Sequence, residues 1–301
     1  MKHLNDIVIP IITPLTENDT IDVPSLERLT EYMISKGVDC LYPCGTTGEM
    51  VYLTDEERML VTETVVRTAK GRVTVFAQVG AANTASTIKL AQHAVACGAD
   101  GIGVVTPWYF QLSDKALVDY YCEVSQSVPD DFPIYLYSIP QNAVNDINAD
   151  TAEKIAQKCK NVLGIKYSYP NMTRLQEMMT VRGGDFDVLV GPDHLYEALV
   201  AVGGKGVVSG NAMIIPEHYI AVRDAMAKGD WQTATKAQRR TNILNSILCA
   251  KNNIGCYKVV LKDLGVISTT KMRKPMEEVS ADDAKKLLAD LCLADYKNVR
   301  L

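Results

Sequence analysis

The sequence predicts a (β/α)₈ barrel, the TIM-barrel fold, with a helical part at its C-terminus. Eight short apolar segments, each of a length typical of buried strands, alternate with segments of helical periodicity. Strands and helices that alternate in this way form parallel sheets built from βαβ units. The chain has 301 residues, enough for eight such units, which need about 250 residues. A doubly wound open sheet is the alternative, but no GxGxxG motif follows the first apolar segment.

Local signals place the strands and the first helices. A first helix begins after Asp22, with proline in its first turn, and ends near Lys36. A second helix begins at Thr54 with a capping box, and residues 84–96 form a third. The strands are expected at residues 7–12, 38–42, 72–79, 101–105, 134–137, 161–168, 186–190 and 206–209.

The last part of the chain is helical by pattern. Helical periodicity dominates after about Pro216, and the longest helical segment covers residues 231–251. This part supplies the eighth barrel helix and a small appendage. Since no low-complexity linker divides the chain, we expect a barrel in residues 1–225 and a helical extension packed on it in residues 226–301.

Composition and charge argue against several classes of function. The chain is 47% hydrophobic and 22% charged, a balance typical of soluble globular proteins. Its net charge of −5 offers no electrostatic basis for binding nucleic acid or an anionic membrane. Pro10 and Pro14 interrupt the first apolar stretch, which therefore resembles neither a signal peptide nor a membrane span. Eight cysteines without a CxxC pair indicate free thiols in a reducing cytoplasm, and the four histidines are not spaced for a metal site, so no metal or cofactor is expected.

Lys166 is the first candidate catalytic residue. It stands near the end of the apolar run 161–168, which predicts a fully buried strand. Burial disfavours the ammonium ion, and a neutral amine in a dry pocket is the nucleophile that forms Schiff bases with carbonyl substrates. Taken alone, such a lysine more often marks the place where a strand reaches the surface.

Two further strand ends add groups to the same mouth, because active sites of such barrels lie at the C-terminal ends of the strands. The second strand is followed by a loop in which Thr46, Thr47 and Gly48 offer hydroxyl and amide donors to an anion, although an ordinary turn would look similar. The fifth strand ends at Tyr137. Neighbouring strands bring Tyr137 within about 5 Å of Lys166 laterally, so its phenol can carry protons for a reactive amine.

The remaining strand ends are less specific. Tyr109 belongs to a run of three aromatic residues after the fourth strand, which indicates a pocket wall or a subunit contact. Asp193 and His194 follow the seventh strand and Ser209 ends the eighth, so all three face the predicted mouth. His194 alone is more often a loop histidine than a catalyst.

These segments together resemble the dihydrodipicolinate synthase / N-acetylneuraminate lyase family. The resemblance rests on Gly45–Glu49 (GTTGE), on Tyr137 with Pro140 three residues later, and on Gly164-Ile165-Lys166, in the family's order and separations. It implies a class I aldolase in which Lys166 binds pyruvate, or a 2-oxo acid that yields it, as a Schiff base. It also implies that Thr46 and Thr47 hold the substrate carboxylate and that Tyr137 shuttles protons. Tyr109 would act across a tight dimer interface, within a homotetramer.

The resemblance also bears on the substrate. Synthases of the family carry an arginine, which binds the carboxylate of the aldehyde substrate, where this chain has Asn142. Sialic acid lyases are similar to this chain at four other positions, which implies that these residues bind the sugar tail: Ser168, Gly191, Asp193 and Ser209. His194 departs from their pattern, because they place an acidic residue there.

We therefore expect a lyase that cleaves N-acetylneuraminate to N-acetylmannosamine and pyruvate. An aldolase for 2-keto-3-deoxy sugar acids is the first alternative, and 4-hydroxy-tetrahydrodipicolinate synthase is the second. A barrel that binds pyruvate without turnover is the alternative from another functional class.

Overall fold

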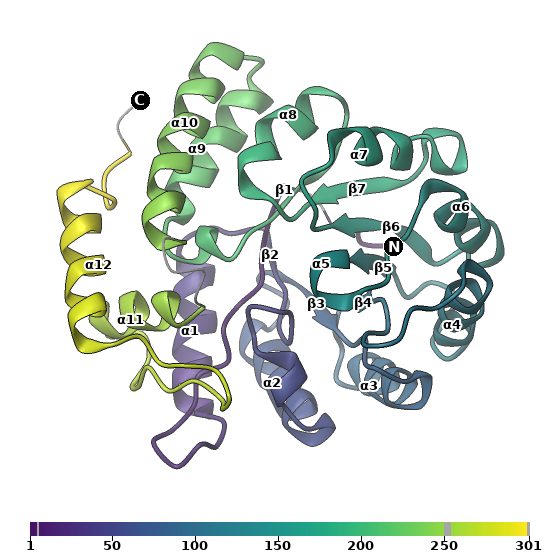
Figure 1. Cartoon of the computed structure of the whole chain (residues 1–301), viewed down its shortest axis with the longest axis horizontal. Helices are drawn as coiled ribbons and strands as arrows, with labels where there is room; N and C mark the ends of the chain where they lie inside the picture. Colours follow the sequence, from purple (N-terminus) through teal and green to yellow (C-terminus); the bar gives the residue numbers. More distant parts are fainter. Residues whose placement is uncertain (5, 250–253, 300–301) are drawn as a thin grey trace.

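Eight strands close into a parallel barrel in sequence order, which confirms the predicted (β/α)₈ fold (Figure 1). The computed structural model describes residues 1–4, 6–249 and 254–299. Closure is completed by β1, which pairs with β2 on one side and with β8 on the other. The strands are β1 (Asp6–Ile9), β2 (Cys40–Leu41), β3 (Thr74–Gln78), β4 (Gly101–Val105), β5 (Ile134–Ser138), β6 (Val162–Tyr167), β7 (Asp187–Val190) and β8 (Gly206–Val208).

Helices surround the barrel and bury its outer surface (Figure 1). They are α1 (Val23–Ser35), α2 (Asp55–Ala69), α3 (Thr84–Ala96), α4 (Asp114–Gln126), the single turn α5 (Pro140–Ala143), α6 (Ala149–Lys158), α7 (Met172–Met178), α8 (Tyr196–Ala201) and α9 (Pro216–Ala227). Short 3₁₀ segments add η1 (Met50–Tyr52), η2 (Val181–Gly184), η3 (Asp193–Leu195) and η4 (Asn211–Met213).

The C-terminal helical part consists of α10 (Trp231–Leu248), α11 (Gly255–Asp263) and α12 (Ala281–Leu293). It lies at one side of the barrel, where α10 packs along α9 and α12 packs on both α10 and α11 (Figure 1). The helix expected at 231–251 begins where predicted, and its predicted end lies outside the described residues. No helix among the described residues is both long and apolar enough to cross a membrane.

The first two strands are shorter than predicted. The sequence indicated residues 7–12 for the first strand, but β1 ends at Ile9. Pro10 has no amide hydrogen to continue the ladder, so Ile11 and Ile12 are buried beyond the strand rather than in it. β2 keeps only two residues of the expected range 38–42.

Glycines on β4 make room for large aromatic residues inside the barrel. Tyr42, Phe76 and other side chains form a separate cluster within the ring of strands. A Cβ atom at Gly101 would lie 2.3 Å from the ring of Phe76, and one at Gly103 would lie 1.8 Å from the hydroxyl of Tyr42. These positions therefore admit no side chain, and the interior below the mouth is filled.

A methyl group at position 103 tests this packing. We expect Gly103→Ala to lower the free energy of unfolding by about 1–3 kcal/mol, because overpacking forces neighbouring side chains from their preferred rotamers. Tyr42→Phe removes the clashing hydroxyl, which has no hydrogen-bond partner among the described residues. The double variant should therefore be more stable than Gly103→Ala alone in urea denaturation. Simple additivity of the two changes would contradict a direct contact.

Candidate active site

Lys166 and Tyr137 lie side by side at the C-terminal ends of two neighbouring strands. The register of β5 and β6 pairs them directly, as the sequence predicts. Lys166 is 5% exposed, and its Nζ lies 3.8 Å from the centroid of the Tyr137 ring and 5.2 Å from that of Tyr42. Two aromatic faces therefore flank the amine and can stabilise a positive charge there, either an ammonium or an iminium ion.

The amine of Lys166 has no counter-ion in the described part of the chain. Its Nζ makes no hydrogen bond or ion pair with any described residue. Lys258, by contrast, is completely buried and forms an ion pair with Glu49 at 2.5 Å. Burial lowers the pKa of Lys258, and the Glu49 carboxylate partly offsets this effect. Since buried lysines are rarely left without a partner, Lys166 stands out as an amine available for chemistry.

The loop after β2 brings hydroxyl groups to the same mouth. The side-chain oxygen of Thr46 lies 3.0 Å from the hydroxyl of Tyr137. Thr47 faces the opposite side, since a Cβ atom at Gly210, which follows β8, would lie 3.3 Å from its Oγ1. The two threonines thus span the mouth between β5 and β8.

The loop also leaves amide hydrogens available. The amides of Gly48 and Glu49 donate to the carbonyls of Gly45 and Thr46, at 3.0 and 3.1 Å. The amides of Thr46 and Thr47 have no acceptor among the residues that the structure describes. Two unused amides beside two hydroxyls are the donors that a carboxylate needs, and anion binding by this loop stays a prediction.

A cavity of about 560 Å³ opens beside Thr46. Asn142 lines it, together with Gln141, Trp108 and apolar side chains. Of the described residues around it, only Glu49 bears a charge, and that charge is neutralised by Lys258. The described wall is therefore uncharged overall and offers hydrogen bonds rather than a cation to a second substrate.

The residues predicted to bind a sugar tail do not line this cavity. Gly191, Asp193 and His194 line a separate cavity of about 390 Å³ against α10. The Oδ2 of Asp193 accepts a hydrogen bond of 2.6 Å from Asn211. Burial raises the pKa of Asp193, while nearby donors on Ser209, Asn211 and Tyr219 oppose the rise.

Ser209 and Ser168 are engaged in packing. Ser209 is 1% exposed; its hydroxyl donates to Tyr219 at 2.9 Å and accepts from the amide of Ala212 at 3.0 Å. The side chain of Ser168 fills the space beside Gly191, where a Cβ atom would approach its Oγ to 2.1 Å. The structure therefore brings Lys166 together with Tyr137 and Thr46, while the binding of a sugar tail by the other predicted residues stays a prediction.

Tyr109 lies outside the mouth of its own chain. It is 80% exposed, has a positive φ of 83°, and packs edge to face against Phe110 at 5.0 Å. This exposure leaves its predicted role across a dimer interface as an expectation.

The sequence analysis missed the ion pair of Glu49 with Lys258. Lys258 stands in the apolar run of α11 beside Val259 and Val260, which are buried. A lysine on an apolar helix face is a signal, because such a residue needs a carboxylate partner. The sequence contains that signal but does not name the partner.

The chain is similar to known proteins over nearly its whole length. Residues 3–293 match the dihydrodipicolinate synthetase family. The 4-hydroxy-tetrahydrodipicolinate synthase of Aquifex aeolicus (strain VF5) is 34% identical over 280 residues, which cover 93% of this chain and 94% of that protein. The crystal structure of dihydrodipicolinate synthase from Aquifex aeolicus has a TM-score of 0.92 at 33% identity and covers 97% of this chain and 99% of that one.

A solved sialic acid aldolase is similar in fold at lower identity. The catalytic lysine mutant of the Ruminococcus gnavus enzyme has a TM-score of 0.92 at 25% identity and covers 99% of this chain and 100% of that one. The match over nearly the whole chain shows the family, whereas the expected closeness to sialic acid lyases is not supported over closeness to the synthases. The chain belongs to the dihydrodipicolinate synthetase family of class I pyruvate-dependent aldolases and is a carbon–carbon lyase.

Proposed function

We propose that Lys166 forms a Schiff base with pyruvate, or with a 2-oxo acid that yields it, and that Tyr137 carries the protons. The observation that supports this most directly is the buried amine without a counter-ion, paired in register with a tyrosine whose hydroxyl reaches Thr46. The carboxylate of the 2-oxo acid binds the amides and hydroxyls of Thr46 and Thr47, which places its ketone at Lys166.

The chemistry then needs only groups already at the mouth. The neutral amine adds to the ketone, and Tyr137 delivers the proton that lets the carbinolamine lose water. The iminium draws electrons from the adjacent carbon. A C3 proton is lost to give an enamine, which adds to an aldehyde; in the reverse direction the C3–C4 bond breaks and releases that aldehyde. Hydrolysis of the final iminium returns the amine. The faces of Tyr42 and Tyr137 stabilise the cationic stages.

The synthase reaction is the first candidate for the overall transformation. In that reaction the enamine of pyruvate condenses with L-aspartate 4-semialdehyde. Its support is the name of the relative that is 34% identical over 93% of this chain, against 25% identity for the sialic acid aldolase.

Cleavage of a hydroxylated 2-oxo acid is the second candidate, and Asn142 favours it. A carboxylate on the aldehyde would meet an amide there instead of a guanidinium, and no described side chain around the cavity supplies a free positive charge. N-acetylneuraminate and 2-keto-3-deoxy sugar acids are the substrates of this kind. Their hydroxyls match the hydrogen-bonding character of Gln141 and Asn142.

Trapping with borohydride tests the Schiff base. We expect pyruvate and borohydride to leave a reduced adduct on Lys166 alone, located by peptide mass spectrometry, because Lys258 is held by Glu49. Lys166→Met should abolish the adduct while the circular dichroism spectrum stays unchanged. A wild-type protein that folds but gives no adduct at Lys166 would remove the mechanism, and an adduct without turnover of any aldehyde or sugar acid would favour a pyruvate-binding barrel.

Removal of one hydroxyl tests the proton carrier. Tyr137→Phe should lower kcat about 10²–10⁴-fold, the usual contribution of general acid–base catalysis, and should slow adduct formation. Tyr121→Phe is the matched control, since Tyr121 is also buried but donates its hydroxyl to the carbonyl of Val104, away from Lys166. Equal losses in the two variants, measured by pyruvate release or consumption, would contradict the assignment.

A substrate panel separates the two candidate reactions. Initial rates are compared for condensation with L-aspartate 4-semialdehyde and for cleavage of N-acetylneuraminate and 2-keto-3-deoxygluconate. If the synthase reaction is native but lacks a carboxylate clamp, Asn142→Arg should raise its kcat/KM by about tenfold or more, because a charge-assisted bidentate bond is regained. Asn142→Gln serves as the uncharged control. Faster cleavage of a sugar acid by the wild type would assign the second candidate.

The same resemblance carries a proposal about assembly. Tyr109 and Phe110 form an exposed aromatic pair. In the chain they follow Trp108, which lines the cavity beside Thr46. In a homotetramer built from tight dimers, this pair would be covered by a second copy, and Tyr109 would extend the proton path from Tyr137.

A further inference from the structure

We propose that Lys258 and Arg273, from the C-terminal helical part, are positioning residues for the Schiff-base reaction. They hold the carboxylate of Glu49 and thereby fix the backbone of the carboxylate-binding loop, residues 44–49. This inference rests on the function proposed above, because it assigns a support to the loop that receives the 2-oxo acid.

Glu49 ends this loop in a backbone conformation that needs support. Its φ of 60° and ψ of 29° lie in the left-handed region, which a residue with a side chain adopts at a cost unless its surroundings hold it there. Its side chain turns inward and the residue is only 2% exposed. One carboxylate oxygen pairs with Lys258 at 2.5 Å, and the other accepts the amide of Arg273 at 2.8 Å. Both oxygens are thus held from outside the barrel.

Lys258 provides charge balance as well as position. Its amine also donates to the carbonyl of Lys271 at 2.5 Å, so the side chain bridges the loop and the segment after α11. Without Lys258, the Glu49 carboxylate would stand three residues from Thr46 as an uncompensated buried negative charge. Such a charge would oppose the binding of a substrate carboxylate at Thr46 and Thr47. A buried ion pair adds little net stability, so its presence here is better explained by positioning.

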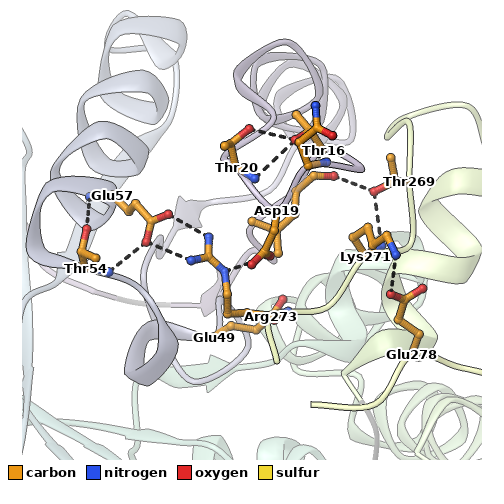
Figure 2. Close-up of polar contacts among 12 residues, drawn as sticks. Thr16, Asp19, Thr20, Glu49, Thr54, Glu57, Thr269, Lys271, Arg273 and Glu278 are labelled. Atoms are coloured by element: carbon orange, nitrogen blue, oxygen red, sulfur yellow. Dashed lines mark hydrogen bonds and ion pairs between the residues drawn. The ribbon is translucent and has the colours of Figure 1, made fainter. Parts of the chain in front are cut away.

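The side chain of Arg273 anchors the backbone segment whose amide binds the Glu49 carboxylate. Figure 2 shows its guanidinium between Glu57, in the first turn of α2, and Asp19, in the loop before α1. The contacts are 2.8 Å from Nη2 to Glu57 and 3.1 Å from Nε to Asp19. Earlier in the same segment, Thr269 donates a hydrogen bond to the carbonyl of Leu15 at 2.6 Å. These contacts fix the amide of Arg273 that binds Glu49.

The same C-terminal part also contributes to the cavity of about 560 Å³ beside Thr46. Ile254 and Met276 line it together with Glu49. Residues of the C-terminal helical part therefore support the carboxylate-binding loop and also form part of the wall of the cavity beside it.

The experiment measures how much pyruvate is needed to load Lys166. The yield of borohydride-trapped adduct is followed against pyruvate concentration for the wild type, Lys258→Met and Arg273→Gln. We expect the half-saturating concentration to rise about 10–100-fold in both variants, since small displacements of binding groups cost factors of this size. The adduct yield at saturating pyruvate should stay at the wild-type level, because Lys166 and Tyr137 are untouched.

Lys271→Met is the matched control. Its side chain lies on the same segment, and its ion-pair partners among the described residues are exposed acidic groups, Glu278 at 3.0 Å and Glu17 at 3.8 Å; Figure 2 shows the contact with Glu278. The carbonyl that accepts from Lys258 is retained. Half-saturation within about twofold of the wild type is expected for this variant, since exposed ion pairs contribute little.

Two further measurements test the positioning role even if Lys258→Met does not fold. If Lys258→Met does not fold, the double variant Glu49→Gln/Lys258→Met removes both buried charges, and its half-saturating concentration should still be raised because the anchor is lost. Wild-type half-saturation in both Arg273→Gln and the double variant would overturn the positioning role while leaving the Schiff base intact. Failure of the wild type to form any adduct would overturn the proposed function itself, so the two failures are distinguishable.

Discussion

Two buried lysines in this protein have opposite surroundings, and the proposed chemistry depends on the difference. Lys258 has its charge satisfied by Glu49, and its role is structural support. Lys166 has two aromatic faces but no counter-ion in the described chain. An apolar and aromatic cluster that includes Tyr42, Phe76 and Tyr135 fills much of the barrel interior.

The parallel register of the strands determines which side chains lie beside Lys166. Tyr137 lies opposite Lys166 because β5 and β6 are parallel neighbours, and Val105 lies opposite Tyr137 on β4. Val105 and Tyr137 also belong to an apolar cluster with Met50, Ile139 and Ala143, against which Trp108 packs. Lys166 is only 5% exposed, and polar contacts are stronger where water is largely excluded.

The sequence predicted most of the fold and the centre of the site, and the limits of that prediction have physical causes. Strand order and the pairing of Tyr137 with Lys166 follow from alternation and from parallel neighbours, so local patterns were sufficient. The hydrogen bond of Asp193 with Asn211 depends on the short η3 turn and on the segment after β8, and local spacing does not predict such a pairing. The partner of Lys258 could not be named, because contacts between distant segments leave no trace in local spacing.

Barrel closure and loop support both depend on late parts of the chain. β1 pairs with β8, and 224 residues separate Arg273 from Glu49. During synthesis the N-terminal strand and the threonine loop therefore emerge long before the groups that complete them. Lys166 also leaves the ribosome before Lys258 and Arg273, so it precedes the groups that hold Glu49 at the end of the loop. The support proposed for the loop therefore forms only after the helical segments that carry Lys258 and Arg273 have been synthesised.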